Sequence, residues 1–126
     1  AACATCHQIG YLGGRLGPDL TRVGTIRSRR DLLEAIIYPS ASFVRSYEPV
    51  LVQLKGDQQA LGILKQDNEE QITLAIGPNA EISVERADIL SMKPATHSLM
   101  PPGLDAILSK DQLGDLLAFL ENTKWR

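Results

Sequence analysis

The sequence predicts a mainly α fold that carries a small antiparallel β-sheet insertion. Two segments, near residues 29–38 and 109–120, repeat apolar residues every three or four positions, which is the period of an amphipathic helix. Between them, from about residue 47 to residue 85, apolar and polar residues alternate, which is typical of half-buried strands. A chain of 126 residues suits one domain, so we expect a single domain over residues 1–126 with a β insert at about 47–85.

Capping residues support both predicted helices. Ser28 can cap the first helix, and Tyr38-Pro39 ends it because proline cannot continue a helix. Ser109 and Gln112 form a capping box in front of the second helix. Within that helix, Gly114 would allow another backbone to approach closely.

The alternating region predicts three or four strands. The alternation begins at Val50, Val52 and Leu54 and is interrupted by the turn sequences Gly56-Asp57, Asp67-Asn68 and Gly77-Pro78-Asn79. So few strands hardly fold alone, and we expect them to pack against the helices.

Charge is distributed unevenly along the chain. Up to Arg45 there are six arginines and three acidic residues, whereas the remainder has seven basic and twelve acidic residues, for a net charge of −2. A nucleic-acid-binding protein needs a concentrated basic excess, so we expect no nucleic acid as partner. No apolar run is long enough to span a bilayer, and any targeting segment before Cys3 is expected to have been removed.

Both cysteines of the chain lie in the segment Cys3-Ala4-Thr5-Cys6-His7. This C-x-x-C-H pattern is the c-type haem attachment motif. Its spacing lets the sulfurs of Cys3 and Cys6 reach the two vinyl groups of one porphyrin, and His7 then falls beneath the iron. The motif therefore predicts one covalently bound haem c with His7 as an axial ligand.

Three other interpretations of the cysteine pair remain. A thioredoxin-like redox motif would follow a strand, and no strand precedes Cys3. A structural zinc site needs four ligands, and only His7 and His97 are available beside the two thiols. A disulfide would leave His7 without a role.

A second axial ligand is predicted at Met100. This methionine precedes Pro101-Pro102, and prolines stiffen a loop that could hold a thioether at a set distance from iron. A soft thioether ligand raises the reduction potential. The competitors are Met92, which precedes Lys93-Pro94, and His97, which would give a bis-histidine site of lower potential.

A glycine-rich loop, Gly13-Gly14-Arg15-Leu16-Gly17-Pro18, follows the cysteine motif. A ligating histidine usually donates its other ring N–H to a carbonyl group, and the Pro18 carbonyl could take that position beside His7. The alternative is an ordinary turn with no contact to the histidine.

Taken together, these motifs resemble class I cytochrome c. The resemblance rests on Cys3 to His7, residues 17–20, Met100-Pro101 and the final helix. It implies the class I cytochrome c fold, mainly α, with His7 as proximal ligand, Met100 as distal ligand and the Pro18 carbonyl orienting His7. Residues 32–40, the strand-rich insert and residues 98–104 further resemble the haem-binding domain family described from planctomycetes and verrucomicrobia, in which the module is commonly part of a larger secreted protein.

The expected function is electron transfer rather than catalysis. The resemblance implies a donor dehydrogenase domain and an electron acceptor as partners. Haem attachment takes place outside the cytoplasm, so a periplasmic or otherwise extracytoplasmic bacterial location is expected. Arg15, Arg22 and Arg27 are candidates for pairing with the haem propionates. The alternative function is a haem-based gas sensor or peroxidase-like enzyme with an open or labile distal site.

Overall fold

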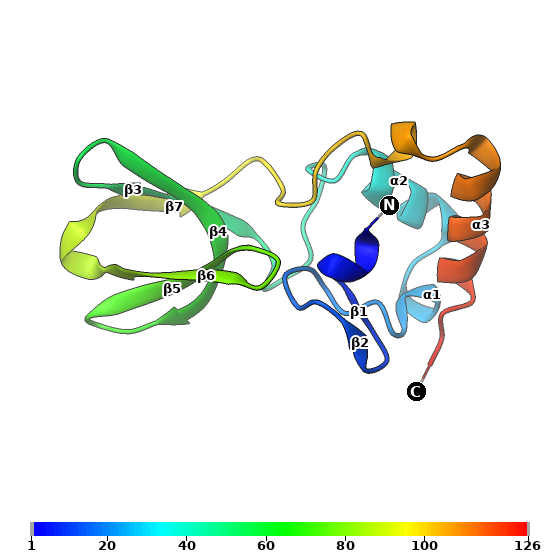
Figure 1. Cartoon of the computed structure of the whole chain (residues 1–126), viewed down its shortest axis with the longest axis horizontal. Helices are drawn as coiled ribbons and strands as arrows, with labels where there is room; N and C mark the ends of the chain where they lie inside the picture. Colours follow the sequence, from blue (N-terminus) through cyan, green and yellow to red (C-terminus); the bar gives the residue numbers. More distant parts are fainter. Residues whose placement is uncertain (1, 126) are drawn as a thin grey trace. The chain divides into compact units, whose positions relative to one another are not determined.

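The computed structural model describes residues 2–125, which divide into two compact units. The first, the helical unit, contains residues 2–42 and 100–125. The second, the sheet unit, contains residues 43–99 and is drawn in green and yellow in Figure 1. The sheet unit therefore begins earlier and ends later than the predicted insert of about 47–85.

The helical unit combines short turns with three α-helices within the described residues. Its elements, in chain order, are the 3-10 turn η1 (Cys3–Thr5), the paired strands β1 (Gln8–Ile9) and β2 (Leu12–Gly13), helices α1 (Val23–Ile26) and α2 (Arg29–Ile37), the 3-10 turn η3 (Leu104–Ile107) and helix α3 (Lys110–Glu121). The two predicted helices are α2 and α3.

Both predicted helix caps are present. The Ser28 hydroxyl accepts a hydrogen bond from the backbone N–H of Asp31 at the start of α2. At the start of α3, the side chains of Ser109 and Gln112 each accept a hydrogen bond from the other residue's backbone N–H, at 3.0 and 2.8 Å. These local contacts satisfy backbone donors that the first turn of a helix leaves unpaired.

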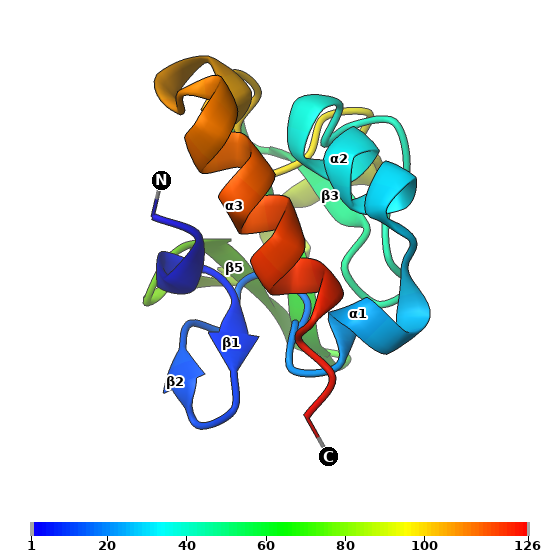
Figure 2. The ribbon, with the colours of Figure 1, turned by 90° about the vertical axis from the view of Figure 1, so that its right-hand side faces the viewer.

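Helix α3 crosses beside α1 and α2 and forms the core of the helical unit with them (Figure 2). The buried residues of this core are Val23, Leu32, Ile36, Leu117 and Leu120. Two backbones approach closely at Gly24 in α1, whose N–H donates to the Thr123 carbonyl oxygen at 2.9 Å. A Cβ on Gly24 would lie 2.2 Å from the Glu121 carbonyl oxygen, so only glycine fits. The close approach expected at Gly114 is wrong, because a Cβ there would meet nothing within 4 Å.

The sheet unit is a five-stranded antiparallel sheet with the strand order β6-β5-β4-β3-β7. Its strands are β3 (Pro49–Leu54), β4 (Gln58–Asp67), β5 (Gln71–Gly77), β6 (Ala80–Glu85) and β7 (Ile89–Pro94), with the 3-10 turn η2 (Arg86–Asp88) before β7. The first four strands follow one another as a meander, and β7 returns to pair with β3. The sheet has a core of its own around the fully buried Val52, Ile72 and Leu74.

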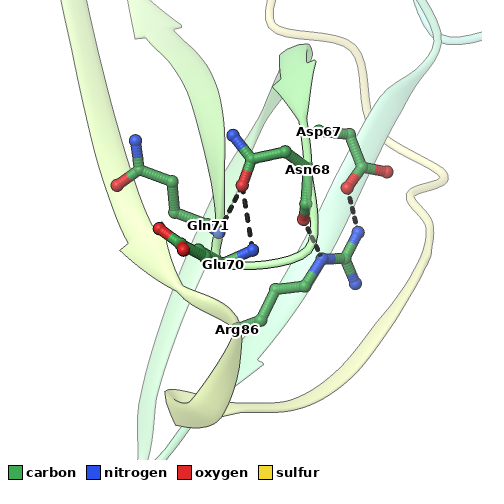
Figure 3. A network of polar contacts seen from close by, with 5 residues as sticks. All are labelled: Asp67, Asn68, Glu70, Gln71 and Arg86. Atoms are coloured by element: carbon green, nitrogen blue, oxygen red, sulfur yellow. Dashed lines mark hydrogen bonds and ion pairs between the residues drawn. The ribbon is translucent and has the colours of Figure 1, made fainter.

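A polar network joins the β4–β5 turn to the turn after β6 (Figure 3). The side-chain oxygen of Asn68 accepts hydrogen bonds from the backbone N–H groups of Glu70 and Gln71, which closes the turn. Arg86 donates from Nε to the Asn68 carbonyl oxygen at 2.7 Å and pairs with the carboxylate of Asp67. Because these groups are exposed, their main effect is to fix the turn geometry rather than to add much stability.

The prediction of a mainly α fold with a small sheet is wrong. Strands make up 31% of the chain and helices 28%, so the fold is mixed and sheet-rich. One reason is that the region around the cysteine motif forms tight turns and a short hairpin instead of a helix. The other is that the sheet continues beyond residue 85 into β7.

The packing at Gly24 predicts opposite effects for two glycine substitutions. Gly24→Ala should destabilise the chain by about 1–3 kcal/mol, because its Cβ forces α1 away from the end of α3. Gly114→Ala should stabilise it by up to about 1 kcal/mol, because alanine is the better helix former and meets no obstacle. Urea unfolding followed by the helical circular dichroism signal measures both. A Gly24→Ala variant as stable as the parent chain would contradict the close approach.

Candidate functional site

The cysteine motif folds into one tight turn. The backbone N–H groups of Cys6 and His7 both donate to the Cys3 carbonyl oxygen, at 3.1 and 2.9 Å. Side chains three residues apart in a 3-10 turn lie one above the other, so the turn brings the two thiols to the same side. Both thiols are free and half-buried.

The surroundings of the Cys6 thiol affect its pKa and so its reactivity. Burial, followed by the influence of the neighbouring Cys3, raises the pKa of the Cys6 thiol. Cys6 is therefore a protonated thiol at neutral pH, and a thiol is a much weaker nucleophile than a thiolate. This disfavours disulfide exchange at Cys6 in the folded chain.

His7 is held by the loop that follows it. Its Nδ1 lies 2.7 Å from the Pro18 carbonyl oxygen, which is the contact that the sequence led us to expect. A carbonyl oxygen only accepts hydrogen bonds, so Nδ1 carries the proton. In the neutral ring, Nε2 then keeps its lone pair, which is the form in which histidine binds a metal.

The glycines of the loop are required by its close contact with the motif. The backbone N–H groups of Gly14 and Gly17 donate to the carbonyl oxygens of Ala4 and Cys6, at 2.9 and 2.8 Å. A Cβ on Gly14 would lie 2.1 Å from the Thr5 carbonyl oxygen, and one on Gly17 would lie 2.6 Å from the His7 ring. The loop is thus moulded to the turn and the imidazole, unlike an ordinary surface turn.

The three candidates for a second ligand fall into different units. Met100 belongs to the helical unit, as His7 does, and is half-buried against the helical core. Met92 and His97 belong to the sheet unit. Met92 lies in β7 opposite Val52. His97 is exposed, and its Nδ1 lies 3.1 Å from the Thr96 hydroxyl.

The candidate arginines surround helix α1 and the glycine loop. Arg15 lies in the loop, Arg22 precedes α1 and Arg27 follows it. All three side chains are exposed, and within residues 2–125 none of them forms an ion pair. They are available to an anionic group.

The helical unit contains the residue types that would hold a c-type haem. It provides two free thiols on one turn, an imidazole with its Nε2 lone pair available, and a half-buried thioether in the same unit. By contrast, no three histidine, cysteine, aspartate or glutamate side chains converge anywhere in residues 2–125. The zinc interpretation therefore has no ligand set in the part of the chain that the structure describes.

The sequence analysis did not identify the hydrogen bonds that Thr21 makes at the end of the glycine loop. Thr21 contacts Asp19, the β1–β2 turn and Trp125. The Asp19-Leu20-Thr21 spacing is typical of an aspartate that accepts from a backbone N–H two residues later, and that signal could have indicated the local contact. Nothing in the sequence indicated the contact with Trp125.

Replacing Gly17 by alanine should break the hydrogen bond between His7 and Pro18, because the new Cβ would overlap the imidazole ring. We expect the variant to be about 1 kcal/mol less stable than the parent chain. Its His7 ring should no longer keep the single Nδ1–H tautomer, and nitrogen NMR of the ring measures this. Gly114→Ala makes the same chemical change in open space and should leave the ring signals unchanged. Unaltered His7 signals in the Gly17→Ala variant would show that the loop does not hold the ring.

No helix within residues 2–125 combines the length and the apolar character needed to cross a bilayer. Comparison with models of known protein families gives no match, and a search of curated proteins gives none either.

Proposed function

We propose that this chain is an electron-transfer module that carries one covalently attached haem c. The observation that carries the proposal is the state of His7, whose Nδ1–H donates to the Pro18 carbonyl oxygen and leaves Nε2 ready to bind a metal. This histidine directly follows a turn that brings together two free thiols. The thiols, their spacing and the tautomer of the histidine all agree with haem attachment.

Each residue has a separate role in this proposal. Cys3 and Cys6 would hold the cofactor through thioether bonds, and His7 would be the proximal axial ligand. When bound, the haem supplies a metal centre that gains or loses a single electron. Met100 would be the distal ligand, and its soft thioether would favour the reduced state and raise the potential.

The proposal describes a carrier and not an enzyme. If His7 and Met100 both held the metal, the chain would leave no position there for a substrate. Its own contribution is then to set the potential and to present the site to other proteins.

The proposal extends to partners and location. A dehydrogenase domain would be the electron donor, and a separate redox protein the acceptor, as the resemblance to the planctomycete and verrucomicrobial haem-binding domains implies. The exposed Arg15, Arg22 and Arg27 would be available to the haem propionates. Because the cofactor is attached outside the cytoplasm, the protein would work in the periplasm or another extracytoplasmic compartment.

A visible absorption spectrum of the purified protein, oxidised and then reduced, tests the proposal. We expect sharp c-type bands on reduction, a weak far-red sulfur-to-iron band on oxidation, and no change on addition of CO. A colourless protein produced with active haem-attachment machinery would contradict the proposal. Haem bands that shift rapidly with CO would instead favour a sensor or an enzyme with an open distal site.

Methionine substitutions identify the distal ligand. Met100→Ala should abolish the far-red band and make the reduced protein bind CO, because the thioether is lost from one axial position. Met92→Ala removes the same side chain from β7 and should leave both properties unchanged. If Met92→Ala and not Met100→Ala abolished the far-red band and allowed CO binding, the distal ligand would be Met92. If only His97→Ala allowed CO binding, the ligation would be bis-histidine.

A further inference from the structure

Thr21 links three separate parts of the helical unit. Its backbone N–H and its hydroxyl both donate to Oδ1 of Asp19. Its hydroxyl oxygen accepts from the backbone N–H of Gly10 in the β1–β2 turn, at 2.9 Å. Its carbonyl oxygen accepts from the backbone N–H of Trp125, at 3.1 Å. One small side chain and its backbone therefore join the loop, the hairpin and the C-terminal tail.

The loop and the strand that follows His7 run alongside each other. Residues 7–10 are joined to residues 18–21 by three contacts, namely His7 Nδ1 to the Pro18 carbonyl, Leu20 N–H to the Gln8 carbonyl, and Gly10 N–H to the Thr21 hydroxyl. The contact at Pro18 lies at one end of this pairing and the contact at Thr21 at the other. Of the two outer contacts, the one at Thr21 can be removed by a substitution that leaves the His7 side chain itself unchanged.

The Thr21 hydroxyl is oriented by its neighbour. Because its proton is directed to the Asp19 carboxylate, its lone pairs are free to accept from Gly10. The hydrogen bonds from Thr21 also lower the pKa of Asp19, so this acceptor stays charged throughout the neutral range. The ring of Trp125 covers Gly10, where a Cβ would lie 2.6 Å from the indole.

We infer that Thr21 is a positioning residue for the haem-ligating histidine. Its hydroxyl keeps residues 18–21 in register with residues 7–10, and this register holds the Pro18 carbonyl on Nδ1 of His7. The inference rests on the proposed function, since it concerns His7 as a metal ligand.

This role has a consequence for the reduction potential. An imidazole whose Nδ1–H is firmly hydrogen-bonded is a more basic ligand and stabilises the more highly charged, oxidised metal. When the register loosens, the hydrogen bond to Pro18 weakens and the ligand becomes less basic. The potential should then rise.

Thr21→Val tests the inference, because valine keeps the shape of threonine and lacks the hydroxyl. In the haem-loaded protein we expect a higher midpoint potential and about fivefold faster solvent exchange of the His7 Nδ1 proton, as loss of a hydrogen bond of about 1 kcal/mol implies. Thr21→Ser keeps the hydroxyl, so its midpoint potential and its exchange rate at His7 Nδ1 should equal those of the wild type. Proton NMR of the reduced protein and a redox titration provide the two measurements.

Thr25→Val is the matched control. Its hydroxyl donates to the Arg22 carbonyl within the same helical turn and reaches neither the hairpin nor the loop. Both readouts should therefore stay at the wild-type values. If the same shifts appeared in Thr25→Val, they would reflect general loosening of the helical unit and would overturn the inference.

The outcomes separate this inference from the proposed function. A wild-type protein without haem bands contradicts the proposed function. A haem-loaded Thr21→Val protein with unchanged potential and unchanged exchange overturns only the role of Thr21. If Thr21→Val does not accumulate, Asp19→Ala removes the acceptor of the hydroxyl from an exposed position and should shift both readouts in the same directions.

Discussion

The hydrogen bond between His7 and the Pro18 carbonyl oxygen is the contact on which the arrangement of the candidate site depends. It requires the loop backbone to lie directly against an imidazole ring and against the turn that carries both cysteines. Three glycines make this approach sterically feasible, because a Cβ on Gly13, Gly14 or Gly17 would lie 2.0–2.6 Å from an atom of the motif. The shape of the candidate site around His7 and the thiols is therefore set largely by the backbone of the glycine loop.

The two ends of the sequence come together around this loop. The carbonyl of Thr21 accepts from the Trp125 backbone, and Gly24 donates to the carbonyl of Thr123, so the tail after α3 is paired with the segment that leads into α1. The core formed by α1, α2 and α3 supports this pairing with buried aliphatic side chains. Segments near both termini therefore belong to one compact unit although nearly half of the chain lies between them.

Much of the local structure was predictable because its causes lie close together in sequence. The caps at Ser28 and Ser109, the end of α2 at Tyr38 and the turn at Gly56-Asp57 each depend on neighbouring residues. Strand β7 was missed because a register shift opposite Gln53 and Leu54 leaves Leu90 64% exposed, which hides the alternation. Long-range contacts were harder to predict, because Gly24 and not Gly114 receives the close neighbour. The overall balance of helix and strand follows from the turns around the cysteine motif and from the extent of the sheet.

The way the sheet unit begins and ends bears on how such a chain can change during evolution. The first and last strands are partners, with Val50 opposite Pro94, and the N–H of Ala95 donates to the Pro49 carbonyl oxygen at 2.9 Å. The polypeptide therefore enters and leaves the sheet at neighbouring points. A segment with this property can be gained, exchanged or lost between two fixed positions of a host chain with little rearrangement of the host. The sheet can accordingly diverge at a pace of its own, while the cysteine turn and its loop stay under the strict steric limits that glycine imposes.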